Sequence, residues 1–349
     1  MLIINDVHIG VARKGGTTPA SQEALRGFLF AGLRKLLEGS DEDTLVTLGD
    51  LFDDFSIPMR DWVETFQVLT EWLDKGHHLV LVAGNHDNSP RADKVSSFTA
   101  LGAVLKESYK HSVKVIDVGQ SGWVDNDTLA IAHCANQDLF NLEIAKALKA
   151  CPRNLLVHCN YANGFAAESD HSLNLSMEQA AELANNGTRV IFAHEHQARE
   201  DLNGKVVVLG NQHPTSVSDC LGNSHKYAHI LGDEDHGSDG ALTKVETWRE
   251  DGSFVLADWQ DLADVDGQFV RVTGTATAAQ ASDVVNAIAA FRQRSDAFVI
   301  TNAVRVEGIA EIDELPEQFE VAKAFDVLNF ICDQLDPSEV ETVNSLLKD

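Results

Sequence analysis

Short apolar runs typical of β-strands alternate, through the first two thirds of the chain, with segments whose apolar residues follow helical spacing. Three such runs, at residues 2–4, 45–48 and 79–82, predict strands. Between them, apolar residues three or four positions apart predict helices over residues 24–37 and 62–73. The order β-α-β-α-β predicts a layered α/β domain.

The alternation continues along the chain and then changes character. Further strands are predicted at residues 129–132, 155–157, 190–193 and 206–209, with helices at 143–148 and 177–184. Residues 225–259 favour β-hairpins, residues 269–306 favour a compact β-α-β unit, and the last stretch favours two helices. We therefore expect three parts, at residues 1–262, 263–310 and 311–349.

Composition narrows the possible functions. The chain has 349 residues with 27 Lys and Arg against 54 Asp and Glu, so its formal net charge is −27. Such a charge argues against a protein that coats nucleic acid or anionic membrane non-specifically, because both require a basic face. The sequence shows neither a basic leader before an apolar stretch nor an apolar window of membrane-spanning length. We therefore expect a cytoplasmic protein that does not associate with membranes.

Metal-binding side chains recur where the predicted strands end. The five cysteines are scattered and form no C-x-x-C pair, so any metal ligands should be His and carboxylates. Open α/β sheets place their ligands at the carboxyl ends of strands, and oxygen and imidazole groups there suit two adjacent divalent ions. The candidate side chains at these strand ends are Asp6, His8, Asp50, Asp53, Asn85, His86, His158, His194 and His196.

The order of these motifs resembles the calcineurin-like metallophosphoesterase family. The motifs are D-x-H at residues 6–8, G-D-x-x-D at 49–53, G-N-H-D at 84–87, a strand-end His158, and H-x-H at 194–196. The resemblance implies a four-layer α/β/β/α sandwich over residues 1–262, with a small capping domain at 263–310. It also implies two divalent metal ions, with manganese expected and magnesium or iron as alternatives.

The same resemblance implies a role for each candidate residue. The first metal would take Asp6, His8, Asp50 and His196, and the second would share Asp50 and add Asn85, His158 and His194. His86 would remain free of metal and act as a general acid, oriented by Asp53.

Within the family, the chain is most similar to the DNA nuclease subunits known as SbcD and Mre-eleven. His158 is followed by Cys159 and Asn160, and residues 209–219 are similar to the segment that closes that nuclease domain. Two departures are Ala193 before the H-x-H motif and Asn211 in place of an expected Ser. The similarity implies a manganese-dependent nuclease of DNA repair and recombination, a 3′ exonuclease and structure-specific endonuclease. It also implies a homodimer whose helical segment at 311–349 docks an SMC-like ATPase of the SbcC or Rad-fifty type.

Substrate contacts and rival functions stay open at this point. Arg13, Lys14 and His213 are the candidates for contacts with substrate phosphate. A small-molecule phosphodiesterase or phosphatase of the same fold suits the acidic composition better than a nuclease does. A catalytically silent scaffold that binds an ATPase is a third reading, which the intact ligand set argues against.

Overall fold

The computed structural model describes residues 1–11, 19–89, 94–170, 172–220, 225–232, 240–266, 268–294 and 298–307. The chain forms two compact units, one of residues 1–274 with 282–304 and one of residues 275–281 with 305–349. The predicted helical segment at 311–349 lies outside the described residues, and the three-part division stays a prediction. The candidate metal-binding residues all belong to the first unit.

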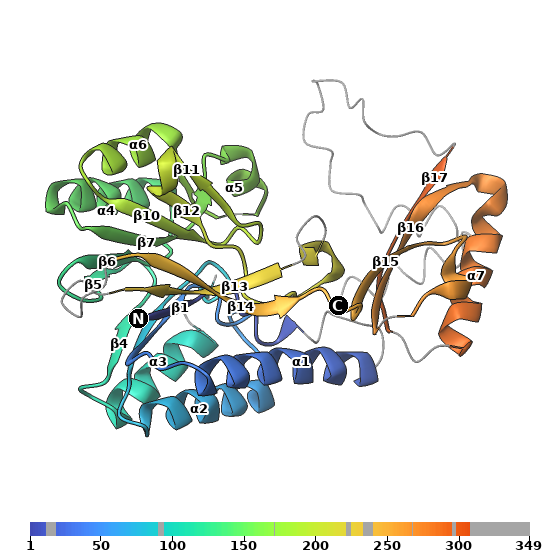
Figure 1. The fold of residues 1–349 in the computed structure, drawn as a ribbon, viewed down its shortest axis with the longest axis horizontal. Helices are drawn as coiled ribbons and strands as arrows, with labels where there is room; N and C mark the ends of the chain where they lie inside the picture. Colours follow the sequence, from blue (N-terminus) through green and yellow to red (C-terminus); the bar gives the residue numbers. More distant parts are fainter. Residues whose placement is uncertain are drawn as a thin grey trace, which may run out of the picture. The chain divides into compact units, whose positions relative to one another are not determined.

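The first sheet contains the three strands that were predicted near the N-terminus. Among the described residues it has six strands, in the order β14-β13-β1-β2-β3-β4. Strands β1 to β4 are parallel, and β13 and β14 are added antiparallel beside β1. Their bounds are Leu2–Ile4 (β1), Thr44–Leu48 (β2), His78–Val82 (β3), Val113–Ile116 (β4), His225–Leu231 (β13) and Leu242–Arg249 (β14). Helices α1 (Pro19–Glu38), α2 (Met59–Leu73) and α3 (Ser97–Ser108) cover one face of this sheet (Figure 1).

A second sheet packs on the other face of the first. In the described part of the chain its strand order is β11-β12-β10-β7-β6-β5. The strands are β5 (Ser121–Trp123), β6 (Thr128–Ile131), β7 (Asn154–His158), β10 (Arg189–Ala193), β11 (Arg199–Asp201) and β12 (Val206–Val208). Helices α4 (Gln137–Ala150), α5 (Gly164–Asp170) and α6 (Met177–Asn185) lie outside it (Figure 1). The short strands β8 (Asn160–Tyr161) and β9 (Asn174–Leu175) pair with each other in parallel. The predicted four-layer α/β/β/α fold is confirmed.

The core explains why these segments fold as they do. Apolar residues of both sheets, such as Ile3, Leu81, Leu156 and Ile191, are fully buried in one cluster between the layers. Helix α3 was not among the predicted elements, although Ser96 caps its first turn by accepting a hydrogen bond from Thr99 N at 3.0 Å. None of the helices in the described ranges combines the length and the apolar composition needed to cross a bilayer.

A third, smaller sheet corrects part of the sequence-based expectation. Strands β16 (Phe269–Thr277) and β17 (Phe298–Glu307) with helix α7 (Ala281–Arg294) confirm the predicted β-α-β order. The predicted hairpin is present as β13 and β14, but β15 (Phe254–Asp258) pairs in parallel with β16. The hairpin interpretation was therefore wrong for β15. Its Phe254 stacks on Phe269 with ring centroids 4.9 Å apart, a long-range contact that local alternation cannot reveal.

One buried histidine predicts a specific pH dependence of stability. His229 on β13 is 1% exposed, and neither ring nitrogen has a hydrogen-bond partner among the described residues. Burial lowers the pKa of His229 to about 4 from 6.5, with Lys244 acting in the same direction. Below pH 6.5 His229 therefore becomes protonated in the unfolded chain but stays neutral in the folded chain, so stability falls as the pH falls. The loss attributable to His229 between pH 7 and pH 5 is about 2 kcal/mol.

Replacing His229 by Leu should remove that part of the pH dependence. We expect His229→Leu to be more stable than the wild type at pH 5, by about 2 kcal/mol beyond any difference at pH 7. Urea denaturation at the two pH values measures this, and the exposed His111→Leu serves as a control that should follow the wild type. If the free energy of unfolding of His229→Leu fell between pH 7 and pH 5 by as much as that of the wild type, His229 would not be the source of this pH dependence.

Candidate metal centre

The strand ends bring the predicted residues to one edge of the two sheets. Asp6 and His8 follow β1, Asp50 follows β2, and Asn85 follows β3. In the second sheet Ala193 is paired with His158, which places His194 beside the end of β7. Four of these residues have left-handed backbone, with φ of 49° at Asp6, 50° at His8, 48° at Asp50 and 88° at His194. Non-glycine residues rarely adopt this conformation, and such strain is concentrated at functional sites.

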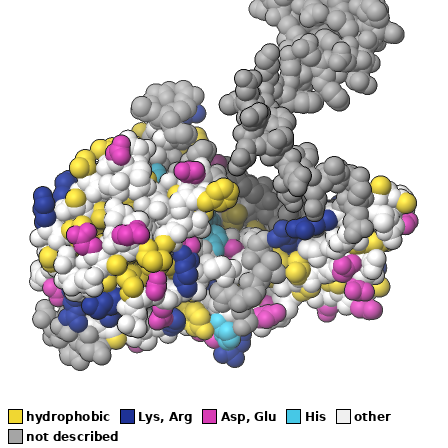
Figure 2. Space-filling model, turned by 90° about the horizontal axis from the view of Figure 1, so that it is seen from above, with side chains coloured by type: hydrophobic (Ala, Val, Ile, Leu, Met, Phe, Trp, Pro, Cys, Tyr) yellow, Lys and Arg dark blue, Asp and Glu magenta, His cyan; other side chains and the backbone are white. Residues whose placement is uncertain are grey.

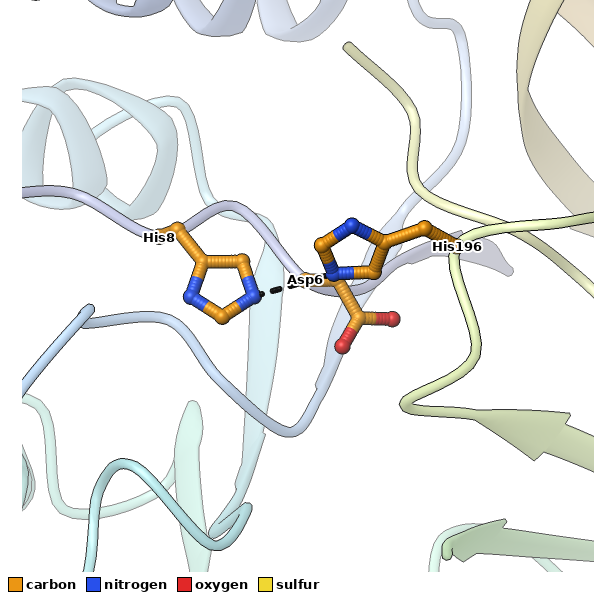
Figure 3. Close-up of side chains that lie close together, drawn as sticks. All are labelled: Asp6, His8 and His196. Carbon is orange, nitrogen blue, oxygen red and sulfur yellow. Dashed lines mark hydrogen bonds between the residues drawn. The ribbon is translucent and has the colours of Figure 1, made fainter. Parts of the chain in front are cut away.

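Three side chains form what we call the Asp6 group: Asp6, His8 and His196. Each offers a potential ligand atom, and these atoms lie within 4.8 Å of one another. The Nε2 atoms of His8 and His196 face each other at 3.2 Å, with the Asp6 carboxylate beside them (Figure 3). Two imidazole nitrogens and a carboxylate oxygen that converge in this way suit a transition-metal ion.

A second set, the Asp50 group, contains Asp50, His158 and His194, again with ligand atoms within 4.8 Å. Asp50 Oδ2 lies 3.2 Å from His158 Nε2, and Asn85 Oδ1 lies 3.0 Å from the same nitrogen. His158 Nδ1 lies 3.1 Å from the carbonyl oxygen of Leu48, which can accept a hydrogen bond from it and leave Nε2 to face the group.

Asp50 stands between the two groups. Its Oδ2 is also 3.9 Å from His8 Nε2, and its Oδ1 accepts a hydrogen bond from His86 N at 3.0 Å. Burial opposes ionisation of Asp50, but the imidazoles of His158, His8 and His86 outweigh burial and hold its pKa well below the ordinary range. Burial also opposes ionisation of His158 and would by itself lower its pKa. The Asp50 carboxylate outweighs burial and raises the pKa of His158 to about 9. The carboxylate thus attracts positive charge strongly at this point.

The donor set fits divalent ions. Asp6 Oδ2 accepts hydrogen bonds from Asn5 Nδ2 at 2.5 Å and from His194 N at 3.0 Å. Asp6 Oδ1, in contrast, is buried without a hydrogen-bond partner among the described residues, which is costly unless a cation satisfies it. The Asp6 group and the Asp50 group would therefore hold two ions with Asp50 shared between them, and Asn85 would complete the second position.

His86 and Asp53 lie beside the Asp6 group. His86 Nδ1 is 2.7 Å from the backbone oxygen of Asp53, and the Asp53 carboxylate is 3.5 Å from His8 Nδ1. Because a carbonyl can only accept, Nδ1 of His86 carries the proton in that bond and Nε2 is left for another partner. Asp53 thus contacts His86 through its main chain, while its side chain also contacts His8. Asp87 joins the two strand-end loops, since its carboxylate accepts hydrogen bonds from Phe52 N and Gly84 N.

Two glycines make room for the ligands. A Cβ atom at Gly49 would lie 2.0 Å from His158 Nδ1, and one at Gly84 would lie 2.2 Å from Asp50 Oδ1. Gly49 also has φ of +79°, a conformation that disfavours any other residue. The glycines of the G-D and G-N motifs are therefore required by side chains that lie far from them in sequence.

We expect Gly49→Ala to weaken metal binding by displacing the His158 ring. A roughly tenfold or greater loss of affinity for Mn²⁺, measured by titration calorimetry, is the expected result. Gly76→Ala is the matched control, because Gly76 has φ of +89° and open space around its Cα. Both variants should lose about 1–3 kcal/mol of stability from backbone strain, but only Gly49→Ala should lose metal affinity. Equal metal affinities in the two variants would contradict the explanation.

A cavity of about 440 Å³ opens over the two groups. Six of its lining residues were candidates from the sequence motifs. The other three are Asn160, Thr215 and Glu195, which lies between the two histidines of the H-x-H motif. The lining residues are His8, Asp50, Asp53, His86, Asn160, His194, Glu195, His196 and Thr215. His213 is buried against α1 instead, with its ring nearly perpendicular to that of Phe28, and burial lowers its pKa to about 4. Arg13 and Lys14 lie outside the described residues.

One important contact was not predicted, although its Asp219 lies in the segment 209–219 that resembles the end of the nuclease domain. Asp219 Oδ1 lies 2.8 Å from His196 Nδ1. Asp219 is 23 residues beyond His196 and follows no predicted strand, so its spacing did not mark it. Only the path of the chain back to the site brings the two side chains together.

Comparisons with known proteins identify the family. A family model described as calcineurin-like phosphoesterase matches residues 1–198. A nuclease MPE from Pseudomonas putida is similar at 15% identity over 70% of this chain and 86% of that chain, with a TM-score of 0.28. A cold-active protein-tyrosine phosphatase of a psychrophilic Shewanella species is similar at 13% identity over 70% of this chain and 79% of that chain, with a TM-score of 0.33.

At these TM-scores neither structure bears on the substrate of this chain. No curated protein matches the sequence. The family model covers 198 of the 349 residues and includes every residue of the Asp6 and Asp50 groups. This protein therefore belongs to the calcineurin-like phosphoesterase family.

Proposed function

We propose that this protein is a metal-dependent nuclease that hydrolyses phosphodiester bonds of DNA, with manganese as the metal that supports it best. Membership of the family implies a metal-dependent phosphoester hydrolase. The observation that carries the proposal is the position of Asp50, between two groups of metal-binding side chains at the floor of an accessible cavity. Two ions held by these groups would clamp phosphoryl oxygens, activate water and offset the charge that develops during hydrolysis.

The chain's own residues prepare the site for that reaction. The Asp6 and Asp50 groups hold their imidazole rings in fixed orientations, because backbone and carboxylate acceptors occupy the Nδ1 atoms of His158 and His196. His86 lines the cavity with its Nε2 available, since its Nδ1 is occupied by the Asp53 carbonyl. Protonated at Nε2, it would donate that proton to the departing alkoxide oxygen of the sugar. The cavity thereby offers metal-binding groups and a proton donor together.

The preference for DNA rests on the sequence. The complete order of motifs from Asp6 to His196, with Cys159 and Asn160 after His158, is most similar to the SbcD and Mre-eleven nuclease subunits. Asn160 lines the cavity, so this motif lies where substrate would bind. From the same similarity we also propose a homodimer and an SMC-like ATPase partner. The ATPase would dock on residues 311–349, which lie outside the described residues.

A small phosphoester is the second candidate substrate, and the charge of the protein favours it. The net charge of −27 repels the DNA backbone. On the face shown in Figure 2, Lys and Arg side chains occur in small groups separated by acidic and apolar side chains, not in a continuous stripe. A DNA substrate would therefore depend on the metals, or on a partner, for much of its electrostatic attraction.

A direct comparison of substrates tests the proposal. The full chain is incubated with 3′-labelled duplex DNA, hairpin DNA and bis-p-nitrophenyl phosphate, each with Mn²⁺, with Mg²⁺ and with a chelator. Release of the 3′ label from the DNA with Mn²⁺, and no release with chelator, is the expected result. Hydrolysis of bis-p-nitrophenyl phosphate without any cleavage of DNA would favour the second candidate. Failure to hydrolyse any ester, in protein that binds metal, would overturn both.

A further inference from the structure

The ring of His196 is held on the side that faces away from Asp6 and His8, the other two members of the Asp6 group. Its Nδ1 lies 2.8 Å from Asp219 Oδ1, while its Nε2 faces His8 Nε2 at 3.2 Å. An ionised carboxylate only accepts hydrogen bonds, so His196 must carry a proton on Nδ1 in this contact. Nε2 then presents its lone pair toward the Asp6 group. The contact with Asp219 therefore selects the tautomer that can bind a metal ion.

Asp219 is itself fixed by a network of donors. Its Oδ2 accepts hydrogen bonds from Thr215 N at 2.8 Å, Thr215 Oγ1 at 2.7 Å, Ser216 N at 3.1 Å and Asn211 Nδ2 at 3.2 Å. The side chain is 8% exposed, so little water competes for these bonds. Four donors on one oxygen leave that oxygen without capacity for a metal ion. Asp219 is thus built to support a ligand instead of acting as one.

The main chain of His196 is held by the same part of the sequence. Lys226 at the start of β13 is 2% exposed, and its Nζ donates a hydrogen bond to the carbonyl oxygen of His196 at 3.1 Å. A buried ammonium group is retained only where it is well paired. Asp219 and Lys226 therefore hold the ring and the backbone of His196, although both lie beyond residues 1–198 that match the family model.

We propose that Asp219 is a positioning residue that fixes the orientation and tautomer of His196 and thereby sets the metal affinity of the Asp6 group. The inference rests on the proposed function, because it takes His196 as a metal ligand. Loss of the acceptor that orients a metal-binding histidine costs roughly 10- to 100-fold in metal affinity. The effect is confined to the Asp6 group, since the His158 ring is oriented independently by Leu48 O.

Titration calorimetry with Mn²⁺ alone tests this on the full-length wild type, Asp219→Asn, Thr215→Val and His8→Ala. The wild type should bind two ions, and His8→Ala identifies the binding step that belongs to the Asp6 group. Asp219→Asn should weaken that same step roughly 10- to 100-fold and leave the other step unchanged. Thr215→Val removes only one donor to Asp219, and it should weaken the same step by a smaller factor. Saturating Mn²⁺ should restore much of the activity of Asp219→Asn.

Asp61→Asn is the matched control for general loss of stability. Asp61 is 5% exposed and is ion-paired with Arg26 in the helical layer, and it belongs neither to the lining of the cavity nor to the metal-binding groups. The variant Asp61→Asn should bind both ions as the wild type does. The role of Asp219 would be overturned if Asp219→Asn bound Mn²⁺ at the Asp6 group with wild-type affinity, or if both binding steps were weakened equally. Absence of metal binding in the wild type would instead overturn the proposed function.

Discussion

Replacing Asp50 by Asn is expected to abolish hydrolysis and to weaken metal binding at both groups at once. The Asp50 carboxylate faces histidines of both groups, at 3.2 Å from His158 Nε2 and 3.9 Å from His8 Nε2. An amide keeps the shape of the side chain but removes the negative charge that attracts both cations. Losing several kcal/mol of stabilisation by the metals corresponds to a loss of rate of roughly a thousandfold or more.

The measurement combines binding with activity. Mn²⁺ titration of Asp50→Asn should show both steps weakened, and hydrolysis of bis-p-nitrophenyl phosphate should fall to the level of the chelator control. Asp61→Asn is again the control, because it removes a buried charge without touching the site. If Asp50→Asn bound one ion with wild-type affinity, Asp50 would not be shared between the two positions.

Replacing His86 by Ala is expected to leave metal binding intact and to slow the cleavage of DNA by roughly a hundredfold to ten-thousandfold. Its ring is bonded to the Asp53 carbonyl and lines the cavity, but its contact with Asp50 is made by the main chain. Truncation of the side chain therefore removes the proton donor and preserves the hydrogen bond that Asp50 Oδ1 accepts from His86 N. The loss of activity should appear as a lower kcat.

The chemistry of the leaving group gives a sharper test of His86. A sugar alkoxide needs a proton as it departs, whereas p-nitrophenolate departs readily without one. His86→Ala should therefore lose much more activity on DNA than on bis-p-nitrophenyl phosphate, with an unchanged Mn²⁺ isotherm. Equal losses on the two substrates would show that His86 acts by some means other than proton donation.

Local patterns in the sequence accounted well for the elements of the sandwich. Apolar runs predicted β1, β2, β3, β7 and β10 nearly at their observed bounds, because a strand buried on both faces must be apolar throughout. They did not predict α3, nor the parallel pairing of β15 with β16. Pairing depends on contacts such as that of Phe254 with Phe269, which are distant in sequence and leave no periodic signal.

The candidate site divides in the same way. Polar residues directly after buried strands marked Asp6, His8, Asp50, His158 and the H-x-H pair, since nothing in the core requires such side chains there. The contact between Asp219 and His196 could not be predicted, because loop segments carry no periodicity that locates them in space. The burial of His213 against α1 could not be predicted either, because it depends on the space that Gly32 leaves for the His213 ring.

The amino-acid sequence was enough to predict the alternation of strands and helices in the N-terminal half, the ligand types and the family resemblance, because these depend on residue identity and local spacing. Tertiary structure alone decided that Asp50 lies between the two groups, that Gly49 and Gly84 leave room for His158 and Asp50, and that Asp219 supports His196. Those features are distances between segments far apart along the chain. Such distances are fixed only when the two sheets pack and their strand ends meet at one edge.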